Sequence, residues 1–344
     1  MKQVDVEKSR LRYVDITKGI AIICIILGHL GNGHINRVVY TFHVPVFFFI
    51  TGFFTNTKRS IRNFVKNKVR TLLVPYLVTC LIITVIGTVE GWILGDARGA
   101  FLKWCYASVY GAGDTYTEPF YIPAIGALWF LWATFWGSLF LRISLECSKY
   151  LRIAFIFALF LFGYCSRAIC WFPLSLQAGA CAAAFLYMGY LLKDAKESMK
   201  QVPSELKCAA VVFSVITWYF FIKDFQSFWF VHCDFGRGIV DILGSVCACF
   251  VVLCISKMLD SKTKYISRFL AFFGKYSLLV LCVHIIELNL FPWRQFTDKL
   301  IAFGMPEVFQ LPFLIIAKLA ADLTCVYILS RISLVRRLYG YRND

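Results

Sequence analysis

Ten apolar runs, each near the length of a membrane-spanning helix, constrain this chain more than any other feature. A helix needs about 20 mainly apolar residues to cross the hydrocarbon core of a bilayer. Charged residues make up only 16% of the 344 residues and the mean hydropathy is +0.69, whereas a soluble protein carries about 25% charged residues. The sequence predicts an all-α integral membrane protein rather than a soluble enzyme or a secreted disulfide scaffold. The runs lie at 13–31, 36–55, 71–94, 124–142, 151–166, 174–192, 208–223, 238–256, 269–288 and 311–330.

The distribution of Lys and Arg predicts how these spans are oriented. With both termini in the cytosol, 26 of the 36 Lys and Arg residues fall in cytosolic segments and eight in external loops. This is the asymmetry of a multi-pass protein, so we expect about ten transmembrane helices, N-in and C-in, in the cell membrane. The same asymmetry accounts for the net charge of +16, and we expect contact with membrane lipids and not with nucleic acid.

The segments between the spans are short, and the longest external one is 95–123. No separate soluble domain fits into them, so residues 1–344 are predicted to form one transmembrane domain. Most of the 14 cysteines sit inside apolar runs, without a CxxC pair or a metal-ligand spacing. We therefore expect no metal and no resident cofactor. Cys105, Cys170 and Cys233 fall in predicted external loops, where pairing stays open.

The first span carries an unusual polar stripe made of Asp15, Lys18 and His29. Eleven residues separate Lys18 from His29, which is about three turns and 20°, so both side chains share one helix face about 16 Å apart. Asp15 lies one turn before Lys18 and joins that face. Ionisable groups in a span usually face the bundle interior and mark a site. The alternative is that Asp15 and Lys18 are interfacial charges and His29 lies among lipid headgroups.

A second histidine, His43, is predicted at a similar depth in the next span. Pro45 follows it and removes a helical hydrogen bond, so we expect the second span to kink there. Two histidines at one depth on neighbouring helices indicate a site more strongly than one buried histidine does.

An ordered set of motifs resembles the acyltransferase 3 family of integral membrane acyltransferases. The family hallmark of a basic residue and a His eleven positions later corresponds to Lys18 and His29, although the family often has Arg where this chain has Lys18. Lys keeps the charge but lacks the forked contact of Arg with phosphate. The other motifs are FHVPVFFFITGFF at 42–54, LLVPY at 72–76, LWFL at 128–131 and GKYSLLVLCVH at 274–284.

The resemblance implies an O-acyltransferase that takes an acyl group, usually acetyl, from cytosolic acetyl-CoA. The acceptor would be a hydroxyl of an envelope or exported glycan, or of a lipid-linked sugar, at the outer face. The lack of an extra domain is similar to stand-alone polysaccharide or fucose O-acetyltransferases.

Acyl transfer to an alcohol needs a general base and donors for the oxyanion. His29 is the predicted base, and an acyl-imidazole on the same ring is the alternative. His43 is predicted to orient His29 or to donate to the oxyanion. On the cytosolic side, Lys18, with Asp15 beside it, and the basic residues before the third span are predicted to hold the CoA phosphates. These basic residues are Lys66, Lys68 and Arg70.

The acceptor side is predicted around Trp129 of the LWFL motif, with Glu118 and Tyr121 from the aromatic-rich segment 95–123. That segment also fits an interfacial aromatic belt. His284 is a further candidate there or a structural histidine.

A transporter or flippase for a polysaccharide precursor or a small molecule is the main alternative function. It would also need many spans and interior polar groups, but it predicts repeated halves and midspan carboxylates. The chain shows no internal repeat, and Glu90, Glu287 and Asp322 are placed near span ends by the sequence.

Overall fold

The computed structural model describes residues 11–341, except the side chains of residues 196 and 294. This part of the chain is helical and contains no strand, only isolated bridges between Tyr116 and Ile122 and between Trp229 and Asp234. The α-helices are α1 (Arg12–Gly28), α2 (Gly33–Val39), α3 (Pro45–Phe53), α4 (Ile61–Lys68), α5 (Val74–Ile93), α6 (Ala97–Tyr110), α7 (Trp129–Ser144), α8 (Lys149–Ser166), α9 (Leu176–Asp194), α10 (Lys196–Lys200), α11 (Ser204–Lys223), α12 (Ile239–Lys262), α13 (Tyr265–Lys275), α14 (Ser277–Leu290), α15 (Trp293–Ala302), α16 (Gln310–Leu329) and α17 (Ser333–Leu338).

Seven helical segments in the described residues are long and apolar enough to cross a membrane, or eight if the bent pair α13–α14 is one span. They agree with seven of the predicted runs, and α13–α14 covers an eighth. An all-helical multi-pass protein is therefore confirmed. The seven segments are Ile61–Ile93, Gly126–Ser144, Lys149–Ser166, Pro173–Asp194, Ser204–Lys223, Ile239–Lys262 and Glu307–Leu329.

The two remaining predicted spans are shorter or broken. Helix α1 has 17 residues. The predicted second span is divided into α2, which ends at Val39, and α3, which begins at Pro45. Pro45 has no N–H to donate back to residue 41, so the helical ladder cannot run through this point. The second span is thus interrupted before Pro45, where the sequence predicted a kink.

The prediction of one continuous helix over 269–288 is wrong. Helices α13 and α14 meet at an angle of 73°, because Tyr276 between them has non-helical backbone angles (φ −104°, ψ 20°). A side chain on Gly274 would overlap the backbone carbonyl of Asp15, and one on Gly19 would overlap that of Leu270. The backbones of α13 and α1 are thus in direct contact, and α14 runs in a different direction from α13.

The segment 95–123, predicted as an external loop, is half helical. Helix α6 folds back along α5, with Gly87 against Trp104 and Gly91 against Ala100. The evenly spaced glycines of this region thus allow close helix packing, as in membrane helix pairs.

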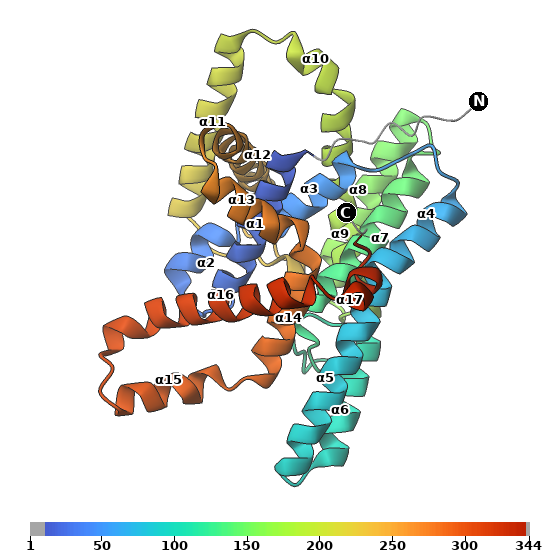
Figure 1. Cartoon of the computed structure of the whole chain (residues 1–344). Helices are drawn as coiled ribbons and strands as arrows, with labels where there is room; N and C mark the ends of the chain where they lie inside the picture. Colours follow the sequence, from blue (N-terminus) through green and yellow to red (C-terminus); the bar gives the residue numbers. More distant parts are fainter. Residues whose placement is uncertain (1–10, 342–344) are drawn as a thin grey trace, which may run out of the picture.

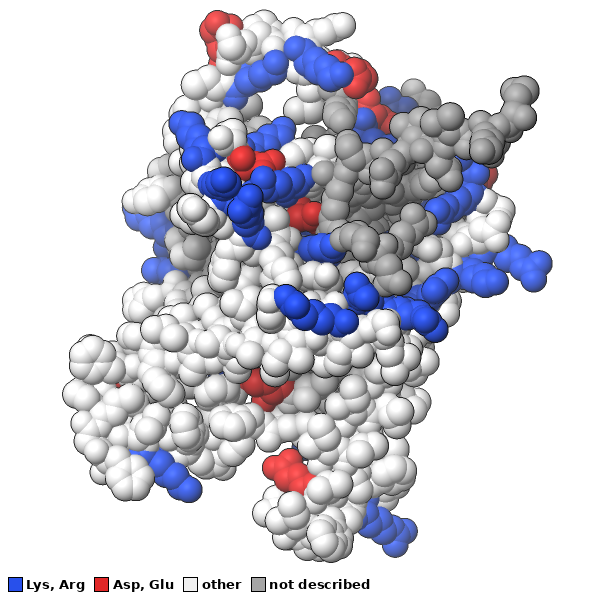
Figure 2. Space-filling view, viewed as in Figure 1, with Lys and Arg blue, Asp and Glu red and all other residues white. Residues whose placement is uncertain are grey.

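The centre of the bundle is built around α1 and α9. Helix α1 packs against α12, α13 and α14, while α9 packs against α3, α7 and α8 (Figure 1). In the view of Figure 2, Lys and Arg gather over the upper part of the molecule near α10 and in a band across its middle at α4 and α17. The lower part, which holds α5, α6 and α15, shows few charges.

Candidate functional site

His29 follows the last residue of α1, and a backbone hydrogen bond determines its tautomer. Its Nδ1 lies 2.8 Å from the carbonyl oxygen of Ile25. A carbonyl oxygen only accepts hydrogen bonds, so Nδ1 carries the proton and Nε2 of the neutral ring keeps a lone pair. The side chain is exposed and lines a cavity. This arrangement leaves His29 able to accept a proton through Nε2.

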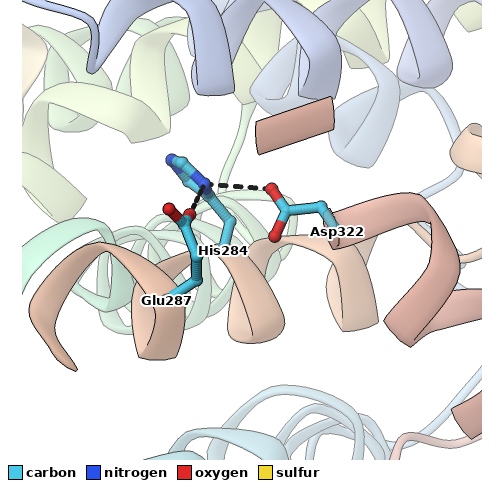
Figure 3. Close-up of side chains that lie close together, drawn as sticks. All are labelled: His284, Glu287 and Asp322. Atoms are coloured by element: carbon cyan, nitrogen blue, oxygen red, sulfur yellow. Dashed lines mark hydrogen bonds and ion pairs between the residues drawn. The ribbon is translucent and has the colours of Figure 1, made fainter. Parts of the chain in front are cut away.

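A buried histidine on α14 lies directly behind His29. His284 has 0% exposed surface, and its Nε2 is 3.4 Å from Nδ1 of His29. Its Nδ1 lies 3.1 Å from a carboxylate oxygen of Glu287 and 3.1 Å from one of Asp322 (Figure 3). Two carboxylates at Nδ1 place a proton there, and a neutral His284 then accepts at Nε2 from His29. The contacts form one chain, from the carboxylates through His284 to His29.

Lys318 of α16 supplies a cation to this cluster. Its ammonium nitrogen lies 2.8 Å from Glu287 and 4.8 Å from the ring centre of Trp293. One oxygen of the buried Asp322, Oδ1, has no hydrogen-bond partner among the described residues. Ligand atoms of His284, Glu287 and Asp322 lie within 4.8 Å of one another and could hold a cation. The His284 N–H and the Lys318 ammonium provide donors for the other three carboxylate oxygens, so the cluster is already held together by its own side chains.

His43 lies in the break between α2 and α3, with Nδ1 2.6 Å from the carbonyl oxygen of Val39. By the same reasoning, its Nε2 is the acceptor nitrogen of the neutral ring. Among the described residues, the hydrogen-bond partners of the His29 ring are Ile25 and His284. His284, and not His43, therefore occupies the position expected for a residue that orients His29. A neutral His43 also cannot donate to an oxyanion through Nε2.

His29 and His43 both line one cavity of about 320 Å³. Its walls come from α1, from the α2–α3 break, from the start of α7, from α14 and from the two loops 111–125 and 224–238. They are mainly apolar, and the polar or aromatic lining residues are His29, Tyr40, His43, Asp114, Trp129, Phe130, Phe228, Trp229 and Phe230.

Of the residues predicted to bind the acceptor, the structure brings only Trp129 to this cavity. Trp129 is buried and lines the wall. Glu118 and Tyr121 are exposed and do not line the cavity. His284 is enclosed behind His29, where it contacts the histidine rather than an acceptor.

Three of the residues predicted to bind the donor, Lys66, Lys68 and Arg70, lie at the start of the third span, and Lys18 and Asp15 lie on α1. Lys18 is close enough to Lys68 for their charges to repel each other, and Asp15 is buried beneath α13. Lys66 is exposed on α4. Arg70 lies in a π-helical turn, Val69–Leu73, and lines a second cavity of about 340 Å³. Its lining residues are Asn67, Arg70, Thr71, Ser333, Arg337, Gly340 and Tyr341.

Three residues of the cluster behind His29 are absent from the predicted site. The sequence-based placement of Asp322 near a span end is wrong, because Asp322 lies inside α16 and is fully buried. Lys318 and Asp322 stand four residues apart within an apolar run, and Glu287 stands three after His284. Ionisable residues inside a span are costly unless they form ion pairs or hydrogen bonds. Their helical spacing within apolar runs is the sequence signal that could have identified Lys318, Asp322 and Glu287.

Comparisons with known proteins agree with this architecture. A family model described as an acyltransferase domain matches residues 11–331, nearly the whole chain. The polar cluster and cavity therefore belong to a membrane acyltransferase. The chain is a member of the acyltransferase 3 family. No curated protein and no solved structure matches it.

Proposed function

We propose that this protein is an O-acetyltransferase of the cell membrane that moves an acetyl group from cytosolic acetyl-CoA to a glycan hydroxyl at the outer face. The observation that carries the proposal is the geometry of His29: its Nδ1 is held by Ile25 and His284, while its ring borders the cavity. An imidazole with a fixed tautomer and a free lone pair is the group that proton abstraction from a hydroxyl needs.

In the proposed reaction, Nε2 of His29 removes the proton of the acceptor hydroxyl while the oxygen attacks the thioester carbonyl carbon. The tetrahedral intermediate collapses, the C–S bond breaks, and the CoA thiolate takes the proton from His29. The products are the acetyl ester and CoA thiol, and His29 is neutral again. His43 supports this step by accepting, at Nε2, a hydrogen bond from a neighbouring hydroxyl of the acceptor, which helps to place the reacting one.

The residues behind His29 stabilise its protonated form. When His29 becomes a cation, its Nδ1–H points to the lone pair of His284, whose own Nδ1–H is held by Asp322 and Glu287. Carboxylates that act through an imidazole in this way hold the tautomer and stabilise the positive charge, as in hydrolase triads. His43 has a backbone carbonyl in the corresponding place, which favours His29 as the base.

The second cavity is the proposed site for the phosphates of acetyl-CoA. Arg70 and Arg337 lie on its wall beside the polar side chains of Asn67, Thr71 and Ser333, and guanidinium groups bind phosphate with two parallel hydrogen bonds. The concentration of Lys and Arg around α4 and α17 in Figure 2 supports a cytosolic position for this face, and hence N-in, C-in.

The test is acetyl transfer from radiolabelled acetyl-CoA in membranes that contain the full chain, compared with His29→Ala expressed to the same level. We expect label in the envelope glycan fraction only when His29 is present. Label that stays on the protein without acceptor, and is lost in His29→Ala, would instead support an acyl-imidazole. Equal labelling by both forms would remove His29 from the chemistry. No labelling together with no binding of acetyl-CoA would favour a transporter.

A further inference from the structure

Two loops that border the cavity are held in fixed positions. In the loop 111–125, Tyr116 and Ile122 exchange both backbone hydrogen bonds, and in the loop 224–238 Trp229 and Asp234 do the same. Arg167 donates to the carbonyl of Cys233 at 2.7 Å. These bonds make the loops a defined wall.

His232 joins the two loops. Its Nε2 lies 3.0 Å from a carboxylate oxygen of Asp114, and its Nδ1 lies 3.1 Å from the hydroxyl of Tyr116. The ring stacks on Trp229 with centroids 5.3 Å apart and planes inclined by 24°. One side chain thus fixes both an indole and a carboxylate at the cavity.

The surface that results has the features of a sugar-binding platform. Trp229 is 45% exposed and lines the cavity together with Asp114. The face of an indole carries partial negative charge, which attracts the polarised C–H groups on one side of a pyranose ring. A carboxylate accepts strong hydrogen bonds from hydroxyl groups, and a few placed polar groups in an apolar pocket give orientation and specificity.

The charge of the cavity distinguishes this platform from a nucleotide site. Among the described residues that line it, Asp114 has a carboxylate and none is Lys or Arg. An anionic side chain without nearby lining cations opposes the phosphates of CoA, whereas the second cavity offers Arg70 and Arg337. A neutral sugar therefore fits the platform better than the adenine end of the donor.

We infer that Trp229 and Asp114 bind a pyranose ring of the acceptor, with His232 as the positioning residue that holds both. This inference rests on the proposed function, because it assumes that the acceptor is a glycan. It adds a binding surface on the same cavity as His29 and His43, beyond Trp129.

The test is saturation-transfer NMR on the full chain, purified in a detergent without a sugar headgroup. The probes are the methyl glycosides of glucose, galactose, mannose and fucose, each offered alone. We expect transfer to the ring protons of at least one probe, and about a fivefold weaker signal in Trp229→Ala, as for the loss of one aromatic contact. Trp229→Phe keeps an aromatic face and should keep most of the signal.

The matched control is Trp92→Ala, because Trp92 is a 73% exposed tryptophan on α5 that does not line the cavity. This variant should bind like the unaltered protein. Asp114→Asn should weaken binding, and His232→Ala should do so too, with His232→Gln restoring part of the signal because its amide can still bond to Asp114. Rescue by Gln would not be expected if His232 only filled space.

Equal signals from Trp229→Ala and the unaltered protein would overturn the inference, as would no transfer to any of the four probes. Saturation transfer to adenosine that disappears in Trp229→Ala would also overturn the inference, because it would show that the indole binds the donor. Acetyl-CoA binding measured on the same samples separates the two proposals. If the unaltered protein binds acetyl-CoA but none of the sugars, only the inference about Trp229 and Asp114 is overturned. If the unaltered protein does not bind acetyl-CoA, the result counts against the proposed function.

Discussion

The two cavities of this protein differ in chemistry. The one beside His29 is lined by aromatic and apolar groups with neutral imidazoles, and its lone charged carboxylate among the described lining residues is Asp114. The one beside Arg70 is polar and carries two guanidinium groups. The first suits proton transfer, because its imidazoles keep an acceptor nitrogen, and the second suits the recognition of phosphate. Under the proposed function, the phosphates of the donor are bound in one part of the bundle, and the acceptor is bound and acetylated in another.

The largest effect is expected from His29→Ala, which should reduce the rate of acetyl transfer by about 10³-fold through loss of the general base. Binding of acetyl-CoA should change little, because phosphate recognition is assigned to the other cavity. The measurement is labelled transfer in membranes, alongside acetyl-CoA binding. His34→Ala, at an exposed position of α2, is the control. If His43→Ala loses more activity than His29→Ala, His43 would be the general base and His29 the supporting residue.

Asp322→Asn should lower kcat by about 10²-fold without raising the KM for acetyl-CoA. The amide can donate as well as accept, so it no longer holds the His284 tautomer or stabilises a protonated His29. Steady-state kinetics in membranes measure both constants. An unchanged kcat in a folded Asp322→Asn protein would show that the cluster serves packing alone.

Arg337→Ala should raise the KM for acetyl-CoA by about tenfold and leave kcat nearly unchanged, as expected for the loss of one charge-assisted hydrogen bond to phosphate. Arg62→Ala is the matched control, because Arg62 is exposed on α4 and does not line the cavity. Equal effects of the two substitutions on the KM would show that acetyl-CoA is attracted by the basic surface in general and is not bound specifically in the second cavity.

The smallest effect concerns Asp114. The hydrogen bond from His232 lowers the pKa of this carboxyl below its ordinary value of 3.8. A carboxyl with a lowered folded-state pKa stabilises the fold above the unfolded pKa, and this contribution is lost as the pH falls through the folded pKa. Asp114→Asn should therefore lower Tm by about 1–2 °C at pH 7, since the pair is partly exposed. The difference should persist at pH 5 and shrink below pH 4. A difference that already vanishes at pH 5 would contradict the assignment.

The sequence predicted the helices better than it predicted the site. Apolar runs identify spans because a bilayer requires them, and Pro45 marked the break because its ring cannot continue a helix. The bend at Tyr276 was missed, since hydropathy carries no information about direction. The stripe pointed to His29, but the contact with His284 joins residues 255 positions apart. Such a contact depends on how α14 packs against α1 and α16, which no local pattern encodes.

The bend between α13 and α14 has a mechanical consequence. Helix α13 is locked to α1 by glycine contacts, so any rotation of α14 pivots about Tyr276. His284 lies eight residues beyond that pivot, or about 12 Å at 1.5 Å per residue, so a tilt of about 5° would move its ring by about 1 Å. That displacement is enough to break a 3.4 Å hydrogen bond to His29. The contact of Asp322 with His284 and the ion pair of Lys318 with Glu287 join α16 to α14 and oppose such a tilt. The alignment of the two histidines therefore depends on α16.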